Sequence, residues 1–125
     1  MAARWIETVT GPWLQKRRYW RYKARRRDLP AQHRTAVEGL DRYVVVTGGI
    51  AHGDVLVQML EDLVELFEQS AADGLSVTDV VGADPVEFAE TFLGNYDDAR
   101  WVTHERRRLG ETIARATSLE HGARG

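Results

Sequence analysis

The chain of 125 residues contains no cysteine, only three prolines and no long uncharged apolar run. Without cysteine it can form neither a disulfide nor a cysteine-containing zinc site, which suits a reducing cytoplasm. No apolar stretch approaches the ~18 residues of a membrane span, and the N-terminal residues lack the apolar core of a signal peptide. We therefore expect a soluble, cytoplasmic protein that does not enter a membrane.

Lysine and arginine are also absent from residues 43–99, which hold 12 carboxylates. Residues 1–42 carry 11 basic and 4 acidic side chains, and residues 100–125 carry six and three, so the net charge of −2 hides a strong asymmetry. This asymmetry indicates electrostatic docking, either of one part of the fold on another or of the protein on a charged partner. The small net charge is not typical of a chain built mainly to neutralise phosphates.

The three prolines lie where helices could begin, at positions 12, 30 and 85. Strict alternation of apolar and polar residues is absent, so no strand is expected. The apolar spacing predicts helices over about 3–9, 12–27, 30–46 and 54–72. A capping box at Ser76 then predicts a single turn that ends at Gly82.

From Pro85 onward a stripe of apolar residues with a 3.6-residue period continues to Ala116. One long helix and two helices both fit this pattern, with a bend near Gly94 and a fresh start that Asp97 could cap. We therefore predict an all-α fold, a compact single-domain bundle of about five helices over residues 1–125. Its ordered core should span about 3–117, followed by a flexible tail at 118–125.

The segment 12–27 combines aromatic residues with many cations. On a helical wheel, Trp13, Trp20 and Ala24 form a narrow apolar stripe, and the cations surround it. We expect this stripe to lie in the core, with the cations partly facing the acidic helix, so that Trp20→Ala would unfold the domain. The same cations are a candidate surface for a protein or polyanion partner: Lys16, Arg17, Arg18, Arg21, Lys23, Arg25, Arg26 and Arg27.

The segment 54–72 separates apolar and acidic residues onto opposite faces. We expect its apolar face to lie in the main core. Its like-charged neighbours cost about 0.2–0.5 kcal/mol per pair, a cost that a basic surface would relieve. The candidate acidic docking face consists of Glu61, Asp62, Glu65 and Glu68.

No catalytic or metal-binding pattern stands out. The acidic helix lacks the Glu-x-x-His pairs of di-iron bundles, and no two of the four histidines, His33, His52, His104 and His121, lie three or four residues apart. The serines lack the context of a nucleophile elbow, and the glycines form no phosphate-binding spacing. We therefore expect no catalytic residue, no metal and no cofactor, and a protein that is not an enzyme.

Several motifs carry a family resemblance: Trp20–Arg25 (WRYKAR), Met59–Leu63 (MLEDL), Ala71–Gly74 (AADG) and Ser76–Val77. Together they resemble the bacterial family known as domain of unknown function ten-forty-eight, over about residues 10–115. The resemblance implies a compact all-helical fold and, in many bacteria, a gene placed beside a PadR-type transcriptional regulator. It implies no catalytic residues.

Two functional interpretations follow. The first is a non-enzymatic helical protein-interaction module that binds a second copy of itself or a transcriptional regulator, as an accessory to a PadR-type regulator. The second is a small nucleic-acid-binding protein that uses the basic and aromatic segment 12–27, where cations and stacking rings alternate. Self-association is expected because a short domain with so many aromatic residues in its N-terminal third does not bury all of them alone.

Overall fold

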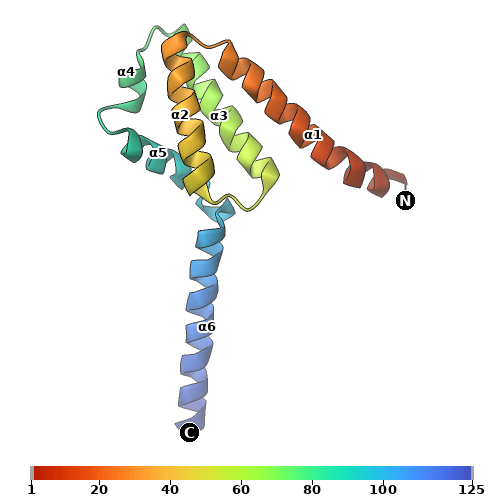
Figure 1. Cartoon of the computed structure of the whole chain (residues 1–125). Coiled ribbons are helices and arrows are strands. Elements are labelled where there is room, and N and C mark those ends of the chain that lie inside the picture. Colours follow the sequence, from red (N-terminus) through yellow and green to blue (C-terminus); the bar gives the residue numbers. More distant parts are fainter. Residues whose placement is uncertain (1, 125) are drawn as a thin grey trace.

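The computed structural model describes the backbone of residues 2–124 and the side chains of residues 13–122 (Figure 1). Its elements are α1 (Ala2–Arg27), α2 (Ala31–Gly48), α3 (Gly53–Ala72), α4 (Val77–Val81), α5 (Pro85–Gly94), the 3-10 turn η1 (Asp97–Ala99) and α6 (Trp101–Arg124). This part of the chain contains no strand, apart from one isolated bridge between Ile50 and Arg100. The predicted all-α class is confirmed.

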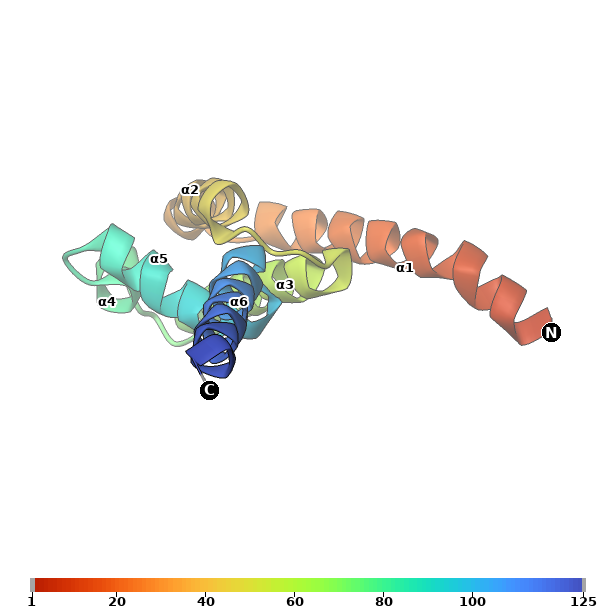
Figure 2. The ribbon, with the colours of Figure 1, turned by 90° about the horizontal axis from the view of Figure 1, so that it is seen from below.

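The helix α3 packs against α1 and α2, and α2 also contacts α4 and α5 on its other side. Viewed along the bundle, α1 and the α4–α5 pair lie at opposite ends of this layer (Figure 2). The core forms where the apolar faces of α2 and α3 meet the end of α5. Its fully buried side chains include Val37, Val44, Met59, Leu63, Val64, Phe67 and Leu93.

The sequence-based division of the N-terminal segment is wrong. We predicted separate helices over 3–9 and 12–27, but α1 continues through Gly11 and Pro12 without a break. A proline inside a helix removes one backbone hydrogen bond and strains the turn before it, but the helix can continue past it. The other two prolines do stand at helix starts, Pro30 as the N-cap of α2 and Pro85 as the first residue of α5.

Local capping chemistry places the short helices as predicted. The Ser76 hydroxyl accepts from the Asp79 amide at 3.1 Å, and the Asp79 carboxylate accepts from the Ser76 amide at 2.8 Å. These bonds lower the pKa of Asp79, since the amide of Ser76 stabilises its charged form. Asp84 caps α5 by accepting from two backbone amides. Both caps confirm the helix starts that the sequence indicates.

The C-terminal region forms two helices. Gly94 ends α5, as the expected bend suggested, but Asp97 lies inside η1 and the new helix begins at Trp101. A new helix start capped by Asp97 is therefore wrong. The last helix then continues to Arg124, so the chain is still helical where we expected a flexible tail from 118.

The start of α6 is fixed to the loop between α2 and α3. The Ala51 amide donates to the Ala99 carbonyl at 2.9 Å, and the Trp101 amide donates to the Gly49 carbonyl at 2.9 Å. The Arg100 guanidinium binds the Gly48 carbonyl at 2.6 Å, which satisfies the free C-terminal end of α2. From this anchor α6 extends away from the bundle (Figure 1). None of the helices described is long and apolar enough to cross a membrane.

Candidate functional site

The side of the basic helix α1 that packs on the bundle is not the tryptophan side that we expected to be buried. Trp13 is 65% exposed, Trp20 is 57% exposed and Ala24 is exposed too, whereas Tyr22 is 1% exposed. At 3.6 residues per turn, Tyr22 lies about 160° around the helix from Trp20. The prediction that the tryptophan stripe lies in the core is therefore wrong. The physical reason is that charged side chains of α1 pair with α3, and apolar periodicity does not detect such contacts.

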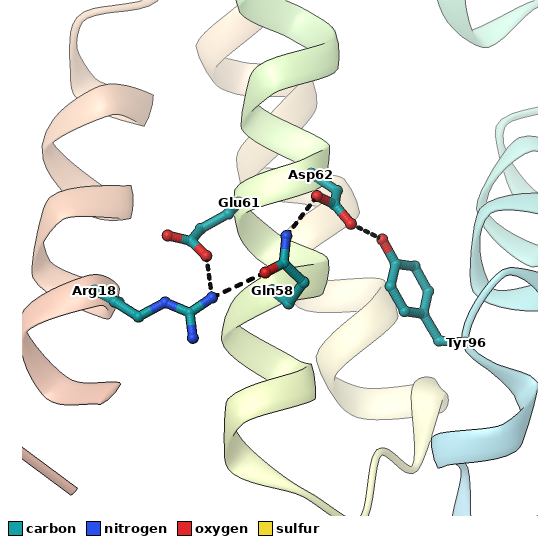
Figure 3. Close-up of polar contacts among 5 residues, drawn as sticks. All are labelled: Arg18, Gln58, Glu61, Asp62 and Tyr96. Atoms are coloured by element: carbon teal, nitrogen blue, oxygen red, sulfur yellow. Dashed lines mark hydrogen bonds and ion pairs between the residues drawn. The ribbon is translucent and has the colours of Figure 1, made fainter. Parts of the chain in front are cut away.

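Two ion pairs join α1 to the acidic face of α3. Arg18 donates to the Glu61 carboxylate and, at 3.1 Å, to the Gln58 side-chain carbonyl (Figure 3). Two turns further along, Arg25 binds Glu68 through Nε at 3.1 Å and Nη2 at 2.5 Å. For both arginines, the hydrogen bond to the paired glutamate carboxylate is the main cause of the raised guanidinium pKa. Because these pairs are partly exposed, each contributes only about 0–1 kcal/mol to stability.

The carboxylate of Asp62 forms hydrogen bonds on the other side of α3. It accepts from Gln58 Nε2 at 2.8 Å and from the hydroxyl of Tyr96, which follows α5 (Figure 3). Burial, reinforced by the hydrogen bond to Asp62, raises the pKa of Tyr96. A continuous polar network therefore runs from Arg18 through Gln58 and Asp62 to Tyr96, and it joins three parts of the fold. Glu65 is exposed and forms no ion pair among the side chains described.

A third polar cluster joins α1 to α2. The buried Tyr22 hydroxyl donates to Asp41 Oδ2 at 2.5 Å, and Arg26 Nη1 binds the same oxygen at 2.8 Å. The Arg26 guanidinium also lies 5.5 Å from the centre of the Tyr22 ring, in range of a cation–π contact. Burial, reinforced by the hydrogen bond to Asp41, raises the pKa of Tyr22.

This raised pKa predicts a loss of stability at alkaline pH. Below about pH 10 the phenol is protonated in both states, so its contribution is intact; above that pH only the unfolded chain releases the proton. For Tyr22 we expect the free energy of unfolding to fall by about 1.4 kcal/mol between pH 9 and pH 11. Urea unfolding at the two pH values measures this loss. Tyr22→Phe should reduce the loss, whereas Tyr19→Phe, at an exposed ring, should leave it unchanged; equal losses in both variants would contradict the assignment.

The remaining cations of the predicted basic surface form no ion pair within the range of described side chains: Lys16, Arg17, Arg21, Lys23 and Arg27. The Lys23 ammonium lies 5.4 Å and 5.3 Å from the ring centres of Tyr19 and Trp20. The solvent side of α1 therefore presents exposed tryptophans with cations on both edges.

The histidines are dispersed. His33 is buried between α2 and α3, its Nε2 lies 2.9 Å from the Leu75 carbonyl and its ring meets the Phe67 ring edge-on. The other three histidines are exposed. Within the described residues, no group of three or more His, Cys, Asp or Glu side chains is placed to hold a metal ion.

Sequence reasoning missed four residues that hold the helices together: Tyr22, Asp41, Gln58 and Tyr96. One signal was available. Arg18, Tyr22 and Arg25 are spaced by four and then three residues, which places them on one face of a helix just as Trp13, Trp20 and Ala24 share the other. The choice between the two faces required knowledge of α3 as the docking surface.

Comparison with known proteins gives one result. None of the curated proteins matches the chain. Residues 13–114, from the basic helix to the middle of α6, match the family described as "Protein of unknown function (DUF1048)". This match covers most of the chain and agrees with the resemblance carried by the sequence motifs. The chain therefore belongs to the DUF1048 family of proteins of unknown function.

Proposed function

We propose that this protein is a non-enzymatic interaction module that binds another protein through the exposed side of α1. We call this side the tryptophan face, formed by Trp13 and Trp20 with Lys16, Arg17 and Arg21 at its edges. The observation that carries the proposal is the exposure of both tryptophans on a helix whose opposite side is held by ion pairs to α3 and α2. Tryptophan and arginine are enriched at the energetic centres of protein interfaces.

The partner that we propose is a PadR-type transcriptional regulator, with this protein as its accessory in the cytoplasm. The family resemblance supports this choice, because it implies such a regulator gene beside the family's genes in many bacteria. The absence of cysteine suits the reducing compartment in which a transcriptional regulator works. In this proposal the tryptophan face binds the partner protein, and no side chain takes part in a chemical step.

Titration calorimetry with the purified regulator encoded beside this protein's gene tests the proposal. Truncating both Trp13 and Trp20 to alanine should weaken binding by at least about 30-fold, as loss of an interface hot spot does. Leu119→Ala, at a side chain that is equally exposed but lies on α6, is the matched control and should bind as the unmodified protein does. Undiminished binding by the double variant would rule out the tryptophan face, and no binding by the unmodified protein would rule out the regulator.

A second candidate function uses the same face. Lys16, Arg17 and Arg21 are free of ion pairs among the described side chains, and they flank exposed rings that could stack on bases. Nucleic-acid binding is nevertheless less favoured, because Arg18 and Arg25 already pair with α3 and the chain has a net charge of −2.

Titration of duplex and single-stranded DNA at two salt concentrations separates the two functions. A nucleic-acid-binding protein should bind at low salt, and joint replacement of Lys16, Arg17 and Arg21 by glutamine should lower the slope of log affinity against log salt by about one per lost phosphate contact. No measurable binding at low salt would remove this candidate. The three replacements leave the ion pairs to α3 intact, so any effect reports on the surface and not on the fold.

A further inference from the structure

The helix α6 has an apolar stripe that no other part of the described chain covers. Every described residue from His104 to Gly122 is exposed, including Leu109 at 63% and Ile113 at 56%. Leu109, Ile113 and Ala116 share one face of the helix, because they are spaced by four and three residues. Most of the stability of a helix in a protein comes from packing of its apolar face, so the stripe is expected to be covered by another surface.

An apolar groove lies along α2. Three adjoining hollows that share lining residues follow the outer face of α2 from Ala31 to Thr47, a length of about 24 Å at 1.5 Å per residue. The central hollow has a volume of about 370 Å³ and is walled by α4 and α5 on its other side. On the α2 side its lining includes Gly39, which has no side chain, and Val81 and Val86 line the opposite wall. Such apolar grooves accept the apolar face of an amphipathic helix.

We propose that α6 of one copy lies in this groove of a second copy, so that two copies exchange their last helices in a closed dimer. A molecule cannot fill its own groove with α6 in this arrangement. The Trp101 amide is bound to the Gly49 carbonyl at the end of α2, and from there α6 points away from α4 and α5 (Figure 1). The reciprocal exchange buries both copies of the stripe and leaves no groove open, which is the closed symmetry typical of dimers.

Charge complementarity supports the groove over direct pairing of two α6 helices. Residues 76–94, which form the α4–α5 wall, hold four carboxylates and no lysine or arginine. The segment 100–125 carries six basic and three acidic side chains, and Arg106 lies on the same face as the stripe. Two α6 helices side by side would therefore bring together the same net positive charge, whereas the α4–α5 side of the groove carries the opposite sign. Glu90 of α5 lies beside the lining, where it accepts from the Tyr43 hydroxyl at 2.5 Å, and the charged residue in the lining itself is Arg42 of α2.

This inference rests on the proposed interaction function and adds a division of labour to it. The stripe of α6 and the groove of α2, α4 and α5 serve a second copy of the chain, and the tryptophan face of α1 serves the other partner. The two surfaces lie on different helices, so a variant in one of them leaves the other intact.

Sedimentation velocity across the micromolar range tests the dimer with the full chain. The unmodified protein should be dimeric, and Ile113→Glu should be monomeric at concentrations where the unmodified protein is fully paired. Ala114→Glu adds the same charge at the neighbouring exposed residue, off the stripe, and should remain dimeric. Gly39→Leu should also be monomeric, because it fills the groove; no atom lies within 4 Å of a Cβ built there, so the monomer tolerates it. A monomer mass for the unmodified protein would overturn the proposal.

Cross-linking identifies what occupies the groove, since the chain has no cysteine and any introduced one is unique. We expect a flexible bismaleimide longer than one helical turn to join Gly39→Cys to Ile113→Cys when the two variants are mixed, but not to join Ile113→Cys to itself. Efficient self-cross-linking of Ile113→Cys, without the mixed product, would show α6 paired with α6 and overturn the groove. If the protein is monomeric but binds the regulator, the proposed dimer is wrong and the proposed function stands. If the protein is dimeric but does not bind the regulator, only the proposed function is wrong.

Discussion

Replacing Tyr22 with alanine is expected to lower the free energy of unfolding by about 3–5 kcal/mol, whereas Trp20→Ala should change it by less than about 1 kcal/mol. Tyr22 is fully buried between α1 and the core, and its hydroxyl donates to Asp41. Truncation would leave a cavity and remove one partner of the partly buried Asp41 carboxylate. The larger Trp20 ring is more than half exposed and contacts mainly Tyr19 and Lys23 on its own helix.

Urea unfolding of the two variants beside the unmodified protein measures both effects. Tyr22→Phe is the matched control, because it keeps the ring and removes only the hydroxyl, and it should cost about 1–2 kcal/mol. The remaining difference between Tyr22→Phe and Tyr22→Ala then reports the packing of the ring. If Trp20→Ala proved the more damaging change, α1 would have to pack on the bundle through the opposite face.

The parts of the fold that depend on local chemistry were predictable from the sequence. The helix predicted over 54–72 is α3, and its apolar face lies in the core, because a strong segregation of apolar and charged side chains leaves only one face to bury. The starts of α4 and α5 followed from the capping box at Ser76 and from Pro85, and in the structure the side chains of Ser76 and Asp84 bind amides two or three residues away. Such bonds need no information from the rest of the chain.

The orientation of α1 was not predictable from its own residues. We expected the cations of this segment partly to face the acidic helix, and the ion pairs of Arg18 and Arg25 agree with that expectation. The helix has two candidate faces, however, and apolar periodicity selected the tryptophans over Tyr22. Its docking is decided by the carboxylates of α3, which lie about 40 residues away in the sequence. Replacing Arg25, Arg26 and Arg27 together would therefore break two ion pairs.

The division between α5 and α6 likewise depends on distant contacts. The apolar stripe continues through this region, so the sequence fitted one helix or two. The break between α5 and α6 is fixed by Arg100, whose guanidinium binds the end of α2. It is also fixed by the backbone hydrogen bonds of Ala99 and Trp101 to the loop between α2 and α3. A stripe that continues into α6 predicts burial within the bundle, but the anchored start directs α6 outward. The exposed stripe of α6 is therefore a surface that the sequence marks as apolar and that the isolated chain leaves uncovered.

The core of α3 yields the second large expected effect. Leu63→Ala should lower the free energy of unfolding by about 2–5 kcal/mol, whereas Glu65→Gln should be neutral or mildly stabilising. Leu63 is completely buried in the apolar core cluster, so its truncation leaves a cavity there. Glu65 lies on the same helix, exposed and beside like-charged carboxylates.

Chemical unfolding of the two variants distinguishes packing from charge within one helix. Removal of the Glu65 charge relieves repulsion among the carboxylates of the acidic face. It also removes the long-range attraction between Glu65 and Arg25, which is one cause of the raised pKa of Arg25, but this attraction contributes little to stability. Added salt should therefore narrow the difference between Glu65→Gln and the unmodified protein while leaving the Leu63→Ala deficit unchanged. A Glu65→Gln variant less stable than Leu63→Ala would mean that the electrostatic contact between α1 and α3 stabilises the fold more than the apolar core does.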